Sequence, residues 1–137
     1  MASTPNFAGT LLPFVSLIQN SDGTNKVAVC STSSAPKKIS ALSLSSTDTA
    51  DRTLAFILTV SSVDYLITTI TAPASSGNAN ATPPVNLLAH ANWTFFEYDA
   101  NGNKVFVIPA SATLYAQSAV AVASTKAISF VGVAQEY

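Results

Sequence analysis

Charged residues are scarce in this chain. Six Lys and Arg residues stand against seven Asp and Glu residues, so 9% of the 137 positions are charged, whereas an average soluble domain has about 25%. With a formal net charge of −1, the chain has no basic field that would bind nucleic acid. A surface with so few charges is either rich in uncharged polar groups or covered by partner molecules in an assembly.

Residue types that carry catalysis or bind metals are nearly absent. Cys30 is the one cysteine and His90 the one histidine, which excludes an internal disulfide and a zinc site built from several cysteines. No motif surrounds either residue, and a catalytic triad needs its histidine beside a nucleophile. Asp22, Asp48 and Asp51 are spaced too widely for a calcium-binding loop. We therefore expect no enzymatic activity, no cofactor and no metal, and we expect Cys30 to be a small buried side chain.

Long hydrophobic segments are missing as well. No apolar run approaches the roughly 20 residues that a membrane-spanning helix needs. Residues 1–9 contain no basic residue and no long apolar core, so they lack the pattern of a signal peptide. We expect a protein that has no membrane contact and is synthesised in the host cytoplasm.

The residues that are present favour β-structure. Ser and Thr fill 33 positions, and the plentiful Val, Ile, Phe and Tyr pack well on pleated surfaces. Residues 53–60 alternate most clearly, with Leu54, Phe56 and Leu58 on one face. Turn sequences such as Asn101-Gly102 separate about eight short segments of this kind, which predicts an all-β, antiparallel β-sandwich or barrel.

The length of the chain fits one domain. Residues 1–9 are predicted to be a short N-terminal arm, and residues 10–137 a single β-sandwich domain. Residues 72–84 are small, polar or proline, but the strands predicted on both sides favour a long loop within the domain. The residues that we expect in the core are Leu54, Phe56, Leu58, Tyr65, Ile67, Phe106, Ile108, Ile128 and Phe130.

An aromatic cluster follows this loop. If residues 93–98 form a strand, Trp93 and Phe95 face one side and Phe96 and Tyr98 the other. One pair would enter the core. The other pair would lie at a subunit interface or bind sugar rings, and aromatic residues anchor interfaces often enough to favour the first. Trp93 and Phe95 are the candidate interface residues of this cluster.

The second face of the strand predicted at residues 53–60 is also partly apolar. It carries Ala55 and Ile57 beside two threonines, although the outer face of a sandwich strand that is open to water should be polar. We expect this face to lie against a neighbouring subunit in a homo-oligomer, a trimer or a dimer. The alternative is that a loop of the same chain covers it.

The order of turns and strands carries a family resemblance. An Asp-Gly-Thr turn follows the first strand, an Asp-Ala-Asn-Gly-Asn turn divides the second half, and strand patterns recur between them; these landmarks are residues 22–24, 39–44, 52–58, 86–88, 99–103, 105–109, 113–116 and 128–137. Over residues 10–137 this order resembles the small jelly-roll decoration, or cement, proteins of tailed-phage capsids. The resemblance implies an antiparallel jelly-roll-like β-sandwich and a structural, non-enzymatic role in the virion, bound to the major capsid protein on the outside of the shell.

The predicted functions follow from that resemblance and from the residues. The first is stabilisation of a capsid, with Pro5, Phe7 and Leu11 as candidates for an arm that lies on the shell. The alternative is a carbohydrate-binding or receptor-binding module of a tail fibre or fimbria, which would use the aromatic residues of 93–98 and the loop 72–84.

Overall fold

The computed structural model describes residues 11–78 and 82–136. The predicted arm, with Pro5 and Phe7, lies outside the described residues. Within them the chain forms strands and two short 3-10 helices, η1 (Asn20–Asp22) and η2 (Leu87–Ala89). The strands are β1 (Leu11–Gln19), β2 (Lys26–Ser31), β3 (Lys37–Ser46), β4 (Arg52–Val60), β5 (Val63–Ala72), β6 (Val85–Asn86), β7 (Glu97–Tyr98), β8 (Lys104–Ile108), β9 (Ala112–Ser118) and β10 (Ala127–Glu136).

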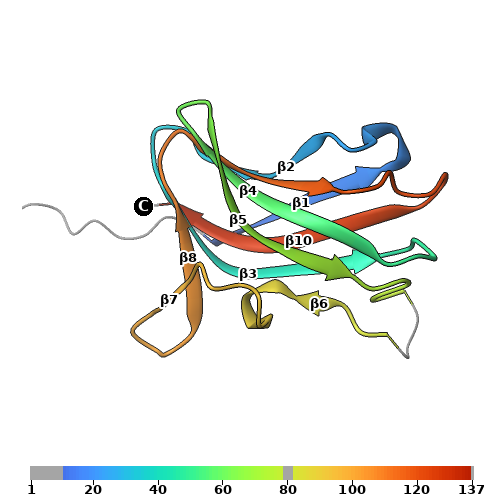
Figure 1. Ribbon diagram of the computed structural model, residues 1–137. Coiled ribbons are helices and arrows are strands. Elements are labelled where there is room, and N and C mark those ends of the chain that lie inside the picture. The colour runs from blue at the N-terminus through green and yellow to red at the C-terminus, as the bar shows by residue number, and fades with distance from the viewer. Residues whose placement is uncertain (1–10, 79–81, 137) are drawn as a thin grey trace, which may run out of the picture.

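The strands form two antiparallel sheets (Figure 1). Sheet A has the order β1-β10-β3-β8-β7, with β6 also pairing with β3, and sheet B has the order β2-β9-β4-β5. Early strands pair with late ones: β1 with β10, β2 with β9 and β3 with β8, while β4 and β5 form the central hairpin. This wrapping of one long ribbon into two facing sheets is jelly-roll topology. The prediction of an antiparallel jelly-roll-like sandwich is confirmed.

Aromatic rings fill the space between the sheets. Trp93 contacts Phe56 edge-on at 5.3 Å between ring centroids and lies 5.1 Å from the ring of Phe106. Phe130 packs on the other side of Phe56, at 6.0 Å. A buried indole needs a partner for its N–H group, and Trp93 Nε1 donates to the carbonyl of Phe95 at 2.9 Å.

Most of the predicted core residues are buried. Leu54, Phe56, Phe106, Ile108, Ile128 and Phe130 are in the core, and Leu58 and Ile67 pack against it while partly buried. Tyr65 is a wrong prediction, since 56% of it is exposed. It lies on β5, the edge strand of sheet B, two residues from the start of the hairpin strand. The sandwich therefore does not extend far enough to cover it.

The segment 93–98 also departs from expectation. Only Glu97 and Tyr98 pair as a strand, with Val105 and Lys104 of β8. Residues 93–96 pair with no strand: Trp93 is buried in the core and Phe95 packs on Phe106. The predicted aromatic strand is therefore a two-residue strand preceded by a loop that closes one end of the core.

Candidate interaction surfaces

The outer face of sheet A carries exposed apolar side chains. Because β1 side chains alternate, Leu11, Val15 and Leu17 point away from the core, and Val15 lies beside Val131 of β10. Val15 is 76% exposed and Val131 is 52% exposed. We call Leu11, Pro13, Val15, Leu17, Val131 and Val133 the apolar strip.

The apolar strip has no charge of its own. Leu11–Gln19 and residues 127–135 contain no Asp, Glu, Lys or Arg. On the far side of β10 the strip continues onto Ala41 and Ser43 of β3, the register partners of Val133 and Val131. Apolar patches that persist on a folded surface commonly mark contacts with other molecules. The strip is therefore the strongest candidate interface on the described surface.

Pro13 and Gly132 fix β1 in its place at the edge of sheet A. Pro13 has no N–H group to donate to a neighbouring strand, and it lies on β1, the edge strand of sheet A. Such a proline protects an exposed edge against pairing with another chain. Behind it, Gly132 leaves room for the ring of Phe14, which a Cβ at that position would touch.

Leu11 is the one predicted arm residue that the structure describes. It is the first residue of β1 and is paired with Gln135, so it belongs to the sandwich. It is also exposed and forms one end of the apolar strip. Val15 and Val131 were not predicted as contact residues, although each lies at an apolar outer position of a segment without charge, which is visible in the sequence.

On sheet B, the predicted interface residue Ile57 is covered by its own chain. It keeps 9% exposure, and its register partners are Leu66 on β5 and Tyr115 on β9. A neighbouring subunit is therefore not needed to bury it, and the cover comes from adjacent strands rather than a loop. Ala55 is only partly exposed. Whether this hairpin also contacts another subunit stays a prediction.

Charged groups also distinguish sheet B. Lys26 on β2 lies with its Nζ 4.7 Å from the centre of the Tyr115 ring and 2.8 Å from Asp64 Oδ2 on β5. Lys26 donates hydrogen bonds to both oxygens of this carboxylate, and Thr59 Oγ1 donates a third, at 2.6 Å. These bonds lower the pKa of Asp64, with the Lys26 hydrogen bond as the main cause.

The aromatic residues assigned to an interface have different environments. Trp93 is 1% exposed, so assigning it to a subunit interface is wrong: its ring is needed between Phe56 and Phe106. Phe95 is 39% exposed and borders a shallow cleft with Tyr65. It stays a candidate contact.

A buried ion pair ties the loops at one end of the sandwich together. Asp48 is fully buried and accepts a hydrogen bond from Arg52 Nε at 2.7 Å. It also accepts from the backbone N–H groups of Ala50 and Ala123, each at 3.1 Å. The Arg52 hydrogen bond is the largest cause that lowers the pKa of Asp48, to about 2. The loop before β4 and Ala123, which is 75 residues away in sequence, therefore converge on one carboxylate.

The remaining reactive groups form no centre within the described residues. Burial raises the pKa of the Cys30 thiol, as expected for a small core side chain. His90 Nδ1 accepts the backbone N–H of Asn92 at 3.0 Å, which stabilises a local turn. Residues 11–78 and 82–136 hold no group of three or more His, Cys, Asp or Glu side chains that could bind a metal. Nor do they contain a helix long and apolar enough to cross a membrane.

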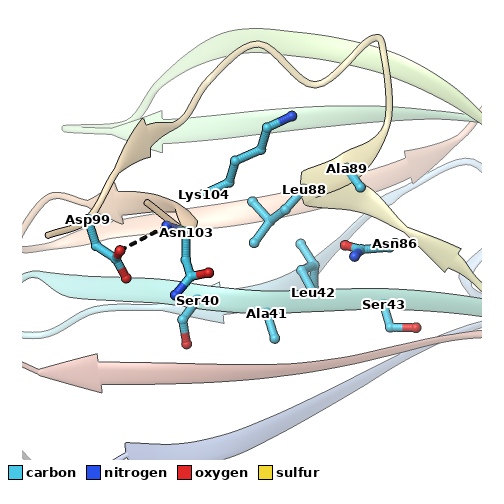
Figure 2. Close-up of a pocket in the computed structure, with 10 residues that line it drawn as sticks. All are labelled: Ser40, Ala41, Leu42, Ser43, Asn86, Leu88, Ala89, Asp99, Asn103 and Lys104. Carbon is cyan, nitrogen blue, oxygen red and sulfur yellow. Dashed lines mark hydrogen bonds between the residues drawn. The ribbon is translucent and has the colours of Figure 1, made fainter. Parts of the chain in front are cut away.

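A groove lies along one side of β3 (Figure 2). Its volume is about 560 Å³, and its walls are β3, the β6–η2 turn and the β7–β8 hairpin. The residues that line it are Ser40, Ala41, Leu42, Ser43, Asn86, Leu88, Ala89, Asp99, Asn103 and Lys104.

Comparisons of the chain with protein-family models, with curated proteins and with solved structures find no match. Function must therefore be argued from the surfaces described above.

Proposed function

We propose that the protein is a structural component of a phage particle, a decoration or cement protein that binds the outer surface of the capsid and stabilises the shell. The observation that carries this proposal is the exposed apolar strip on β1 and β10, where β1 and residues 127–135 of β10 contain no charged residue. The major capsid protein would be its partner. The scarcity of charge in the whole chain also supports the proposal that partner molecules cover much of its surface in an assembly.

The protein would stabilise the shell by burying surface against the capsid subunits. A protein that straddles the junction between two capsid subunits loses its contacts when they separate, so it adds to the free energy needed to open the shell. A standard interface buries about 1,600 Å² in total, and a shell repeats it many times. Each fully buried valine or leucine contributes about 1.5–3 kcal/mol before the entropic cost of association.

Self-association is a second part of the proposal. We expect a closed homo-oligomer, a trimer or a dimer, with the partly exposed Ala55 and the exposed Leu66 on its contact face. Sedimentation of the purified protein at tens of micromolar tests it. A protein that remains monomeric there has no intrinsic oligomer.

One observation favours a second candidate function, a carbohydrate-binding or receptor-binding module of a tail fibre or fimbria. Tyr65 and Phe95 are both exposed and border a cleft whose other walls are Leu58, Leu66, Ile67 and Thr94. The burial of Trp93 reduces the aromatic platform that such a module would use.

The composition of purified virus particles from the source of this sequence tests the main proposal. We expect the chain in the particles, and a map of the particle should show sheet A facing the shell. The variant Val15→Lys/Val131→Lys should fold and be lost from the particles. Thr53→Lys/Thr71→Lys is the matched control, because it adds the same two charges at exposed, register-paired positions of sheet B. Absence of the wild-type chain from particles, or normal incorporation of Val15→Lys/Val131→Lys, would overturn the proposal.

A further inference from the structure

The groove beside β3 exists because two strands share one side of β3 without meeting. β8 pairs with Lys37, Lys38 and Ile39, and β6 pairs with Ser43 and Leu44. Figure 1 shows β8 running steeply across the end of the sandwich and away from β3. Residues 40–42 therefore have no strand beside them on this side.

The groove is held open by buried residues. Leu42 on β3 and Leu88 on η2 both line it and are nearly fully buried. Leu87, next to Leu88, is in the core. Two of the three walls, β3 and the β6–η2 turn, are therefore anchored in the core, and the turn between β7 and β8 forms the third.

Several polar groups around the groove are already oriented. Asp99 Oδ1 accepts the backbone N–H groups of Asn101 and Asn103, both at 2.9 Å. The bond from Asn103 is the main cause that lowers the pKa of Asp99, so this carboxylate is ionised at neutral pH. Lys104 Nζ lies 4.5 Å from the centre of the Phe96 ring, which restrains the ammonium group. Figure 2 shows Asp99 and Asn103 side by side at one end of the groove.

The chemistry of the lining indicates the class of ligand. The charged residues of the lining are Asp99 and Lys104, whose ammonium group lies over the Phe96 ring, so the lining residues have no net charge. The hydroxyls of Ser40 and Ser43 and the amides of Asn86 and Asn103 can both donate and accept, whereas the apolar part is small and aliphatic. Such a mixture complements a neutral ring with many hydroxyl groups.

A peptide strand fits less well. An uncovered strand edge commonly invites an extended peptide. Here the gap covers residues 40–42, about 10 Å of strand. β8 closes one end and β6 the other on the same side of β3. An extended chain would collide with one of them, whereas a compact ring would not.

We propose that this groove binds a neutral saccharide of one or two rings, with Asp99, Asn103 and Asn86 as its hydrogen-bonding partners. The groove volume of about 560 Å³ lies within the usual range of ligand sites. This proposal is independent of the capsid function. Ala41 borders both the groove and the apolar strip, so a shell that covered all of β3 would close the groove, and the test uses free protein.

The test is titration of the isotope-labelled full chain with glucose, galactose, mannose, N-acetylglucosamine, rhamnose and lactose. Concentrations up to about 50 mM detect binding with a millimolar Kd. We expect at least one sugar to shift the backbone amide signals of Ser40, Leu42, Asn86 and Asn103. The variant Asp99→Asn should weaken that binding about tenfold or more, because it removes a charged acceptor. An asparagine oxygen can still accept the two backbone N–H groups, so the turn should persist.

Asp51→Asn is the matched control, since Asp51 also accepts a backbone N–H, from Ala74 at 2.8 Å, and neither residue lines the groove. It should leave sugar binding unchanged. A second variant, Ala89→Tyr, places a bulky side chain at an exposed groove residue and should abolish binding in a folded protein. The proposal is overturned if none of the six sugars shifts groove amides, or if Asp99→Asn and Ala89→Tyr bind as well as wild type. It is equally overturned if the blocked tripeptide Thr-Val-Thr, and no sugar, shifts the same signals.

Discussion

Apolar side chains on the outer faces of the two sheets differ in how much of their surface is exposed. On sheet B, Ile57 is flanked by Leu66 and Tyr115, and it keeps little exposure. On sheet A, Val15 has Val131 beside it on one side and the open sheet edge on the other, and most of its surface remains accessible. Large neighbours on both sides can cover an outward-facing residue. An edge position beside a small neighbour cannot.

The two outer faces also differ in their charged groups. On sheet B, Lys26 forms an ion pair with Asp64 and lies over the ring of Tyr115. Along β1 and through residue 135 of β10, sheet A has no charged group. The comparison shows that apolar residues in outward positions do not by themselves mark an interface. Their cover and their charged neighbours must be considered together.

Lysine substitutions test this comparison most directly. Ile57→Lys would bury a charge between Leu66 and Tyr115, and we expect the free energy of unfolding to fall by about 3 kcal/mol. Val15→Lys changes an exposed position and should stay within about 0.5 kcal/mol of wild type. Urea unfolding followed by the fluorescence of Trp93 measures both. Equal losses of unfolding free energy would contradict this comparison, because they would mean that Val15 on the apolar strip is as deeply covered as Ile57 on the hairpin.

Acid should weaken the fold without acting on the apolar strip. The folded pKa of Asp48 is about 2, below its ordinary value of 3.8, so its ionised form stabilises the folded state. That contribution is fully present above about pH 4 and is lost as the pH falls toward 2; it amounts to about 2 kcal/mol. Stability curves for wild type and Asp48→Asn should therefore differ in slope across this range. Parallel curves would assign acid unfolding to other groups.

Gly132→Ala should loosen β1 on sheet A while sparing sheet B. The new Cβ would press on the ring of Phe14 and lie 2.7 Å from the carbonyl oxygen of Ala41, which belongs to the backbone and cannot easily move. We expect a loss of about 2 kcal/mol and faster hydrogen exchange in β1 than in β4. Ser129→Ala on the same strand is the control. Uniform exchange in both sheets would contradict this local effect.

The smallest effect should come from the charges on sheet B. Asp64→Asn removes the partner of Lys26, but both side chains are substantially exposed. Exposed ion pairs contribute little and are screened by salt. We expect a small loss of stability at low ionic strength that disappears in concentrated salt. A loss that salt does not change would mean that Asp64 acts through its bond with Thr59.

The alternation of apolar and polar residues correctly predicted which side chains of β4 face the core, because that does not depend on the adjacent strands. Leu54 and Phe56 are buried and Ala55 faces outward, because successive side chains of any strand point to opposite faces. The same rule assigned Ile57 to the outer face correctly. It carries no information about the side chains beside Ile57, so a partner subunit was inferred where the chain covers the residue itself.

The errors arose where tertiary packing decides the local structure. The aromatic residues of 93–98 suit a strand, but the end of the core needed Trp93 between Phe56 and Phe106. No prediction covered the conformation of the β4–β5 turn, where Ser61 and Ser62 both have positive φ angles, of 50° and 63°, without the usual glycine or asparagine. The register then shifts between Phe56 and Ile57. The groove was equally invisible, because it depends on where β8 leaves β3.

The pairing of β1 with β10 also has a mechanical consequence. Leu11 and Gln135 are register partners, so the outer ends of both strands lie at the same end of their ladder. A pulling force on these two ends would break the hydrogen bonds between β1 and β10 one after another. A load applied through the outer face of sheet A would instead be shared by β1, β10 and β3 together. The fold is therefore weak against tension at its strand ends and strong against force carried across that face.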